Sequence, residues 1–133
     1  MGLEAAIDGL RTAASGMAGL ARTYDDPPES LSEFPACVVY ARSGEMTAVS
    51  AGFGKDLHTL VVEVYESREM LAEAVDRAKV WPDRLKAAIV ADETLGGSVE
   101  AVVWPVRYRA GVMAYSKVAH YGVRFEVTVK VLT

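Results

Sequence analysis

The chain has 133 residues, of which 51% are hydrophobic and 24% are charged, and its formal net charge is −4. This length predicts a single domain over residues 1–133, and the ordinary balance of apolar and charged residues excludes a largely disordered chain. The acidic balance disfavours a dedicated nucleic-acid-binding protein, which usually carries a basic stripe. No apolar run approaches the roughly 18 residues that a membrane span needs, so we expect no membrane partner.

Residues 3–22 carry apolar side chains at steps of four and three, and this spacing predicts an amphipathic helix. Gly9, Gly16 and Gly19 each weaken such a helix by about 1 kcal/mol relative to alanine. The helix therefore needs tertiary support or close approach to a neighbour. Its apolar stripe fits either the core of the domain or a contact between subunits.

Residues 23–33 contain two adjacent prolines and cannot continue the helix, so they predict a loop. The loop carries four acidic residues and no basic one, and Asp25, Asp26 and Glu29 are three of the four. It serves either as a solvated connector or as an acidic surface that faces a partner or a channel. The spacing of its acids does not resemble a calcium loop, so no metal is expected there.

The middle of the chain predicts strands. Residues 35–42 read as a strand that begins at a proline, 43–45 as a turn, and 46–51 as a second strand of a hairpin. The segment 52–56 contains two glycines but lacks the ending of a phosphate-binding loop. Residues 57–65 are apolar on one face and partly apolar on the other, which indicates a central strand covered in part on both sides.

A helix pair follows this strand. Ser67 is a suitable N-cap, and Pro82 predicts a break at Val80-Trp81 with a second short helix beginning at the proline. Glycines at 96–97 end that helix. We expect Trp81 and Trp104 to lie in the core, with an interface role as the alternative.

The end of the chain predicts two antiparallel strands, over residues 99–109 and 112–131. A turn is expected at Ala110-Gly111 and an irregular stretch near Ser116-Lys117. Residues 120–131 alternate between apolar and polar, which is typical of a strand with one buried and one wet face, and His120 falls on the wet side. The order of elements predicts an α+β fold with a mixed, mainly antiparallel sheet and helices packed on one face.

No pattern of residues indicates catalysis. Cys37 is the only cysteine, lies in an apolar run and is expected to be buried, with no base nearby to activate it. His58 falls on an apolar strand face, and neither histidine has a partner at metal-ligand spacing. Arg107 and Arg109 flank a tyrosine, which could form a nucleic-acid stacking strip, but the acidic net charge disfavours this. We therefore expect no enzyme activity, no cofactor and no metal.

Three segments in this order resemble the tail terminator family, also called tail completion proteins, of long-tailed bacteriophages. The first is an N-terminal helix and proline loop followed by 34–39, FPACVV, entering the sheet. The second is 57–65, LHTLVVEVY, leading into a helix. The third is 92–99, DETLGGSV, followed by a strand and the closing 121–127, YGVRFEV.

The resemblance implies a structural virion protein at the head-proximal end of the tail, which assembles as a ring in the host cytoplasm. The ring, which is commonly six-fold in that family, would cap the tail tube protein, stop its polymerisation and offer a docking surface to head–tail connector proteins. DNA would pass through without sequence-specific binding. An acidic lining would suit that passage, because like charges prevent DNA from sticking.

The expected contact segments are the glycine-rich first helix, the proline loop and the 43–56 hairpin. Their candidate interface residues are Gly16, Gly19, Asp25, Asp26, Glu29, Met46 and Phe53. Two other functions stay open. One is a head-closure or other neck protein, which a basic lining would favour. The other is a small ligand-binding domain, which would need a pocket with converging polar groups.

Overall fold

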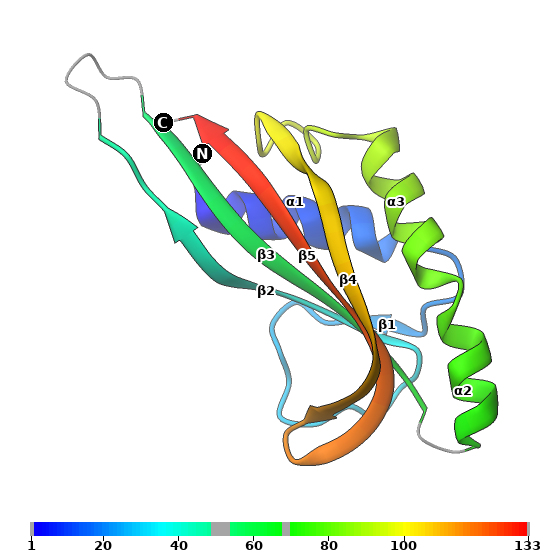
Figure 1. Ribbon diagram of the computed structural model, residues 1–133. Helices are drawn as coiled ribbons and strands as arrows, with labels where there is room; N and C mark the ends of the chain where they lie inside the picture. Colours follow the sequence, from blue (N-terminus) through cyan, green and yellow to red (C-terminus); the bar gives the residue numbers. More distant parts are fainter. Residues whose placement is uncertain (1, 49–53, 68–69, 133) are drawn as a thin grey trace.

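The computed structural model describes residues 2–48, 54–67 and 70–132. In chain order, its elements are α1 (Leu3–Ser15), β1 (Arg22–Thr23), β2 (Ala36–Glu45), β3 (Lys55–Glu66), α2 (Leu71–Ala78), α3 (Trp81–Ala91), β4 (Ala101–Tyr115) and β5 (Val118–Leu132). The strands form one sheet in the order β1-β2-β3-β5-β4 (Figure 1). Short β1 runs parallel to β2, and the other pairs are antiparallel, which confirms the predicted α+β class. No helix in these ranges is long and apolar enough to cross a membrane.

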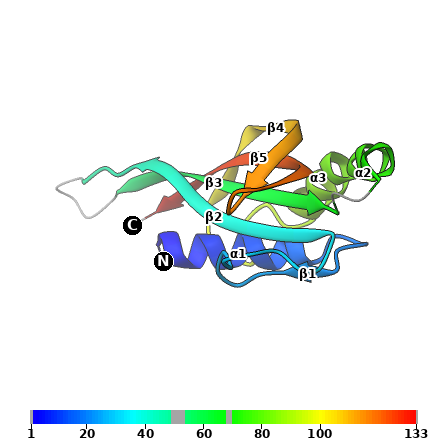
Figure 2. The ribbon, with the colours of Figure 1, turned by 90° about the horizontal axis from the view of Figure 1, so that it is seen from below.

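The main core lies between the sheet and the helices. Partner pairs such as Leu60–Val127 and Val62–Phe125 join β3 to β5 and point their side chains to the same face. There they form one buried cluster with side chains of α1 and α3. Figures 1 and 2 show α1 crossing behind the sheet and α3 lying beside β4. The helices therefore cover one face, as the sequence predicted, and we call the opposite face the open face.

The open face has a small apolar cluster of its own at one end. Tyr24, Tyr65 and Met113 are buried there together, and Phe34 packs against them. Tyr24 and Phe34 belong to the segment between β1 and β2, so the proline-containing loop covers this end of the sheet. The hydroxyl of Tyr115 also donates a hydrogen bond to the carbonyl oxygen of Pro28. As a result β3, with both neighbours in place, is buried from Leu60 to Glu66, which confirms it as a central strand.

The free ends of β2 and β3 form an arm that projects beyond α1 (Figures 1 and 2). Every residue from Arg42 to Ala48, which make up the end of β2 and its continuation, is exposed. The arm stays paired beyond the last strand residue because the hydroxyl of Thr47 donates to the carbonyl oxygen of Lys55 at 2.6 Å and accepts from its N–H at 3.2 Å. The expected turn at 43–45 was wrong, since these residues continue β2 opposite residues 57–59 of β3.

The arm also differs from the expected hairpin over residues 46–51. Residues 46–48 are not a strand, and residues 49–51 lie outside the described part of the chain. The pairing of β2 runs directly to β3, so the hairpin is made by these two long strands. The extra strand was predicted from an expected turn at 43–45, which the structure does not contain.

The turn between the last two strands was predicted in the wrong place. Residues Ala110 and Gly111 lie inside β4, paired with β5, and the chain reverses at Ser116-Lys117. These two residues have φ values of 48° and 70°, which fit the two-residue turn that joins twisted strands. Serine and lysine are not the usual residues at such positions, so the glycine at 111 misled the prediction.

The first helix ends at Ser15, seven residues earlier than expected. The N–H groups of Gly16 and Met17 bond carbonyl oxygens three residues back, which tightens the last turn. Gly19 then adopts a φ of 93°, a left-handed conformation that an α-helix does not allow. The apolar spacing in the sequence extends beyond Ser15 because Met17, in the loop after the helix, is also buried in the core.

Three single-residue predictions were also wrong. Helix α2 begins at Leu71 rather than after Ser67, and Met70 precedes it with a φ of 55°. Trp104 is 39% exposed, because it lies on the edge strand β4, whereas Trp81 is buried as predicted. His120 is buried rather than exposed, because Phe34 and Tyr65 pack against its ring.

Gly9 allows α1 to approach the turn before β4. A Cβ atom at this position would lie 2.1 Å from Ser98 Oγ and 2.6 Å from the carbonyl oxygen of Leu95, which are hydrogen-bonded to each other. We expect Gly9→Ala to lower the free energy of unfolding by about 2 kcal/mol, although alanine favours helices. Urea unfolding measures this. Gly2→Ala, which meets open space, is the control, and equal effects would contradict the close approach.

Cys37 gives a second prediction, on pH dependence. Burial first, and then the charge of Glu63, raises the pKa of its thiol from 9.0 to about 12. A group whose pKa is higher in the folded state stabilises the fold below its unfolded pKa and loses that contribution as the pH rises to its folded pKa. Between pH 9 and 12 this thiol should therefore lower the free energy of unfolding by roughly 1 kcal/mol per pH unit. Urea unfolding over this range should show a shallower fall for Cys37→Ala, and identical slopes would contradict the assignment.

Candidate functional site

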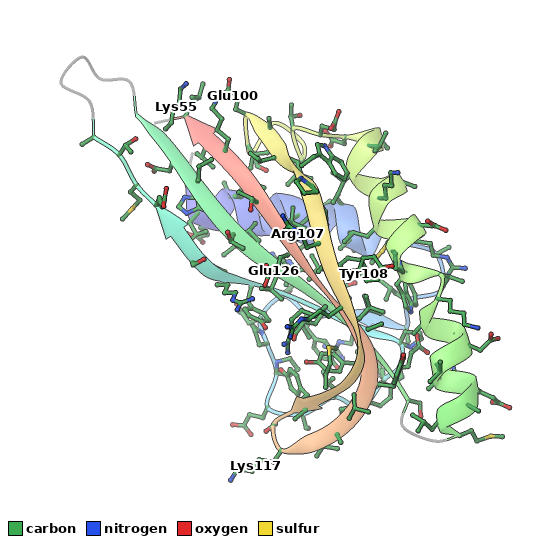
Figure 3. All side chains as sticks on the ribbon, viewed as in Figure 1. Lys55, Glu100, Arg107, Tyr108, Lys117 and Glu126 are labelled. Carbon is green, nitrogen blue, oxygen red and sulfur yellow. The ribbon has the colours of Figure 1, made fainter. Side chains whose placement is uncertain are left out.

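The open face carries a charged patch across three strands. Arg42 is the extra residue of a β-bulge, since the register of β2 against β3 shifts between Ala41 and Ser43. Its guanidinium forms an ion pair with Glu126 of β5, so the side chain reaches across β3. Glu126 in turn lies directly opposite Arg107 of β4. Figure 3 shows Arg107 and Glu126 on neighbouring strands, on the face opposite α1.

A more buried ion pair, between Arg124 of β5 and Glu63 of β3, lies next to these charged side chains. Nε of Arg124 donates a hydrogen bond to Oε2 of Glu63 at 2.6 Å, and the Glu63 side chain is only 4% exposed. The hydrogen bond to Glu63 raises the pKa of Arg124 further. Burial first, and then the charge of Glu63, raises the pKa values of Tyr40 and Tyr65, whose hydroxyl groups also bond Glu63. The pair is therefore held in a network of four side chains.

Two further arginines add positive charge that the described residues do not neutralise. Arg109 lies directly opposite Arg124, and Arg107 lies opposite Glu126, which Arg42 already pairs. No described residue forms an ion pair with Arg107 or Arg109. Together these side chains surround an open hollow of about 650 Å³, which we call the arginine hollow. Its lining residues are Arg42, Pro105, Val106, Arg107, Tyr108, Arg109, Arg124 and Glu126.

An acidic groove lies on the other side of the sheet, between α1 and β2. Glu4, Asp8, Asp25 and Asp26 line it, and Arg11 is the only basic residue in the lining. Arg11 bonds Asp8 at 2.5 Å and donates to the carbonyl oxygen of Asp25 at 2.7 Å. The carboxylate of Asp25 also forms an ion pair with Nε of Arg11 at 3.6 Å, and the Asp25 side chain is 94% exposed. The groove therefore keeps an excess of negative charge at the surface.

The structure brings Asp25 and Asp26 together but separates the other predicted interface residues. Gly16 and Gly19 follow the far end of α1. Gly19 has a reason within the chain: its left-handed φ, and Nη1 of Arg84, which would lie 2.9 Å from an added Cβ. Arg84 also donates to the carbonyl oxygen of Ala18. Gly19 is thus accounted for by the turn between α1 and β1, which Arg84 of α3 contacts.

Of the last three predicted interface residues, the structure describes Glu29 and Met46, and Phe53 lies outside the described residues. Glu29 is exposed in the proline-containing loop, next to the carbonyl of Pro28 that Tyr115 bonds. Met46 is 80% exposed on the projecting arm. The described members of the predicted set therefore do not form one continuous surface within a single copy.

Sequence reasoning missed the arginine hollow as a unit. Arg107 and Arg109 were noticed as a pair two residues apart, and Arg124 was placed on the wet face of the last strand. What joins them is the register of β4 against β5, which depends on the misplaced turn. Arg42 gave no signal, because its position results from a bulge.

Within residues 2–48, 54–67 and 70–132, no group of three or more histidine, cysteine, aspartate or glutamate side chains could hold a metal ion. The sequence matches no family model, and it also matches no curated protein.

The buried pair gives a test of how the hollow is held. We expect Glu63→Gln to lower the free energy of unfolding by about 2 kcal/mol, because it removes the counter-charge of Arg124 from a carboxylate position that is only 4% exposed. The matched control is Glu126→Gln, which breaks an ion pair between two exposed side chains and should cost less than about 1 kcal/mol. Urea unfolding compares the two variants. Equal losses would show that Glu63 does not hold the patch together.

Proposed function

We propose that this protein is a phage tail terminator subunit: a structural protein that assembles into a ring at the head-proximal end of the tail tube. The ring stops polymerisation of the tube protein and presents a docking surface to the head connector, while DNA passes through its centre. The proposal combines the resemblance of the three sequence segments with surfaces of the fold that a single copy leaves without partners.

The projecting arm is the observation that carries the proposal. From Arg42 to Ala48 it exposes every residue, and in both views it extends beyond α1. Residues 55–59 of β3 are paired with β5, so the arm is supported on that side, whereas β2 beyond Cys37 has no strand on its other side in the described residues. A neighbouring copy in a ring can cover this exposed side, since a ring contact joins two different surfaces of the same chain.

A head-closure or other neck protein is the second candidate. The arginine hollow favours it, because a basic surface on the open face would suit contact with DNA. A terminator and a neck protein differ in what they bind first. A terminator recognises the end of the tail tube, whereas a neck protein joins the connector on the head.

The test is the mass of the protein in solution over a wide concentration range, with negative-stain images of the same samples alone and mixed with tail tubes. We expect rings with an open centre, or caps on tube ends, because the unsupported surfaces of one copy are covered only by another. A compact monomer that ignores tube ends at every concentration would refute the terminator proposal. Binding to purified connectors but not to tubes would favour the neck protein instead.

A further inference from the structure

We propose that the arginine hollow of one copy binds the acidic groove of a second copy, and that this head-to-tail contact closes the ring. The inference rests on the proposed function, whose site it specifies. It names Arg107 and Arg109 as the groups that bind, and Asp25 and Asp26 as the groups that they recognise.

The arginine hollow contains a charge arrangement that folding alone does not favour. Arg109 and Arg124 are directly opposite each other on antiparallel strands, where like charges destabilise the sheet. Glu63 neutralises Arg124, but no described residue neutralises Arg109. Arg107 competes for Glu126 with Arg42, which already forms the ion pair. Two guanidinium groups thus remain available to a carboxylate from outside.

The acidic groove carries the opposite excess. Four carboxylates line it against one guanidinium, and the proline-containing loop presents Asp25 and Asp26 at the surface. Arginine binds carboxylates with two parallel hydrogen bonds, so two arginines two residues apart on one strand suit two adjacent aspartates. The two surfaces therefore complement each other in sign and in the number of groups.

One copy cannot satisfy both surfaces by itself. The groove lies between α1 and β2, and the hollow lies on the open face, with Arg107 and Glu126 turned away from α1 (Figure 3). A contact between two different surfaces is heterologous, so each copy uses its hollow for one neighbour and its groove for the other. This places Asp25 and Asp26 in a contact between subunits rather than in the lining of a DNA channel.

Charge reversal tests the contact from both sides. One variant carries Arg107→Glu and Arg109→Glu, and the other carries Asp25→Arg and Asp26→Arg. Each should weaken self-association by at least about tenfold, because like charges then face each other. An equal mixture of the two variants should assemble again, since every hollow in an alternating ring meets a groove of opposite sign. A single chain with all four substitutions should also assemble.

Sedimentation velocity at low and high salt, alone and with tail tubes, measures the association. Lys79→Glu with Lys117→Glu is the matched control for the arginine variant, because it changes the net charge by the same amount at exposed positions outside both surfaces. It should leave association nearly unchanged. Circular dichroism and urea unfolding establish that each variant is folded. Arg109→Gln adds a test that misfolding cannot imitate: it should weaken association while leaving the unfolding midpoint unchanged or higher.

The outcomes separate this inference from the proposed function. If the unmodified protein forms rings or caps and the reversed variants do so equally well, the inference is wrong and the terminator proposal stands. If the unmodified protein stays monomeric even with tubes, both the inference and the terminator proposal fail. If the arginine variant loses binding to a short DNA duplex while its self-association is unchanged, the hollow binds nucleic acid and the inference is overturned. Rescue of assembly by mixing the two variants would establish the contact.

Discussion

The ion pair between Glu63 and Arg124 joins the two central strands on the open face, and the polar surface of this protein depends on it. Burying a carboxylate is costly unless a counter-charge and hydrogen bonds compensate it. Here Arg124 supplies the charge, and the hydroxyl groups of two tyrosines supply further bonds. With Arg124 fixed, the register places Arg109 directly opposite it, so the excess positive charge of the hollow follows from how Glu63 is satisfied.

The two faces of the sheet therefore contribute differently to the protein. The helix-covered face is almost entirely apolar, and its aliphatic side chains provide the stability of the fold. The open face combines one buried network with charges that repel one another, which lowers stability slightly. Natural proteins retain such local conflicts mainly where a partner relieves them. The apolar core therefore supports the charged surface on which the proposed contact between copies depends.

The sequence predicted the parts of the fold that depend on long periodic patterns. The alternation of β5 was predicted because one of its faces is buried, and the central position of β3 because both of its faces carry apolar side chains. The helix break was predicted because Pro82 cannot lie in the interior of a helix. The misplaced elements depended on local backbone geometry instead: the positive φ angles at Ser116 and Lys117, the left-handed Met70, and the bulge at Arg42. The candidate site, the arginine hollow, combines the bulge at Arg42 with the register of β4 against β5, which follows from the turn at Ser116 and Lys117. Predicting the arginine hollow required the strand register, which only the correct turn supplies.

The two edges of the sheet explain why assembly should rely on charged side chains rather than on strand pairing. Unpaired edges invite uncontrolled addition of further strands unless bulges, charges or prolines protect them. In the described residues, β1 pairs with β2 only at Ala36 and Cys37. The rest of this edge of β2 has no pairing strand, and it carries the bulge at Arg42. The edge of β4 carries Pro105 and a bulge between Val103 and Arg107. With both edges blunted, copies of this chain cannot simply continue the sheet. Contacts through opposite charges are weaker and sensitive to salt, so a template that holds the copies in place can decide when the ring forms.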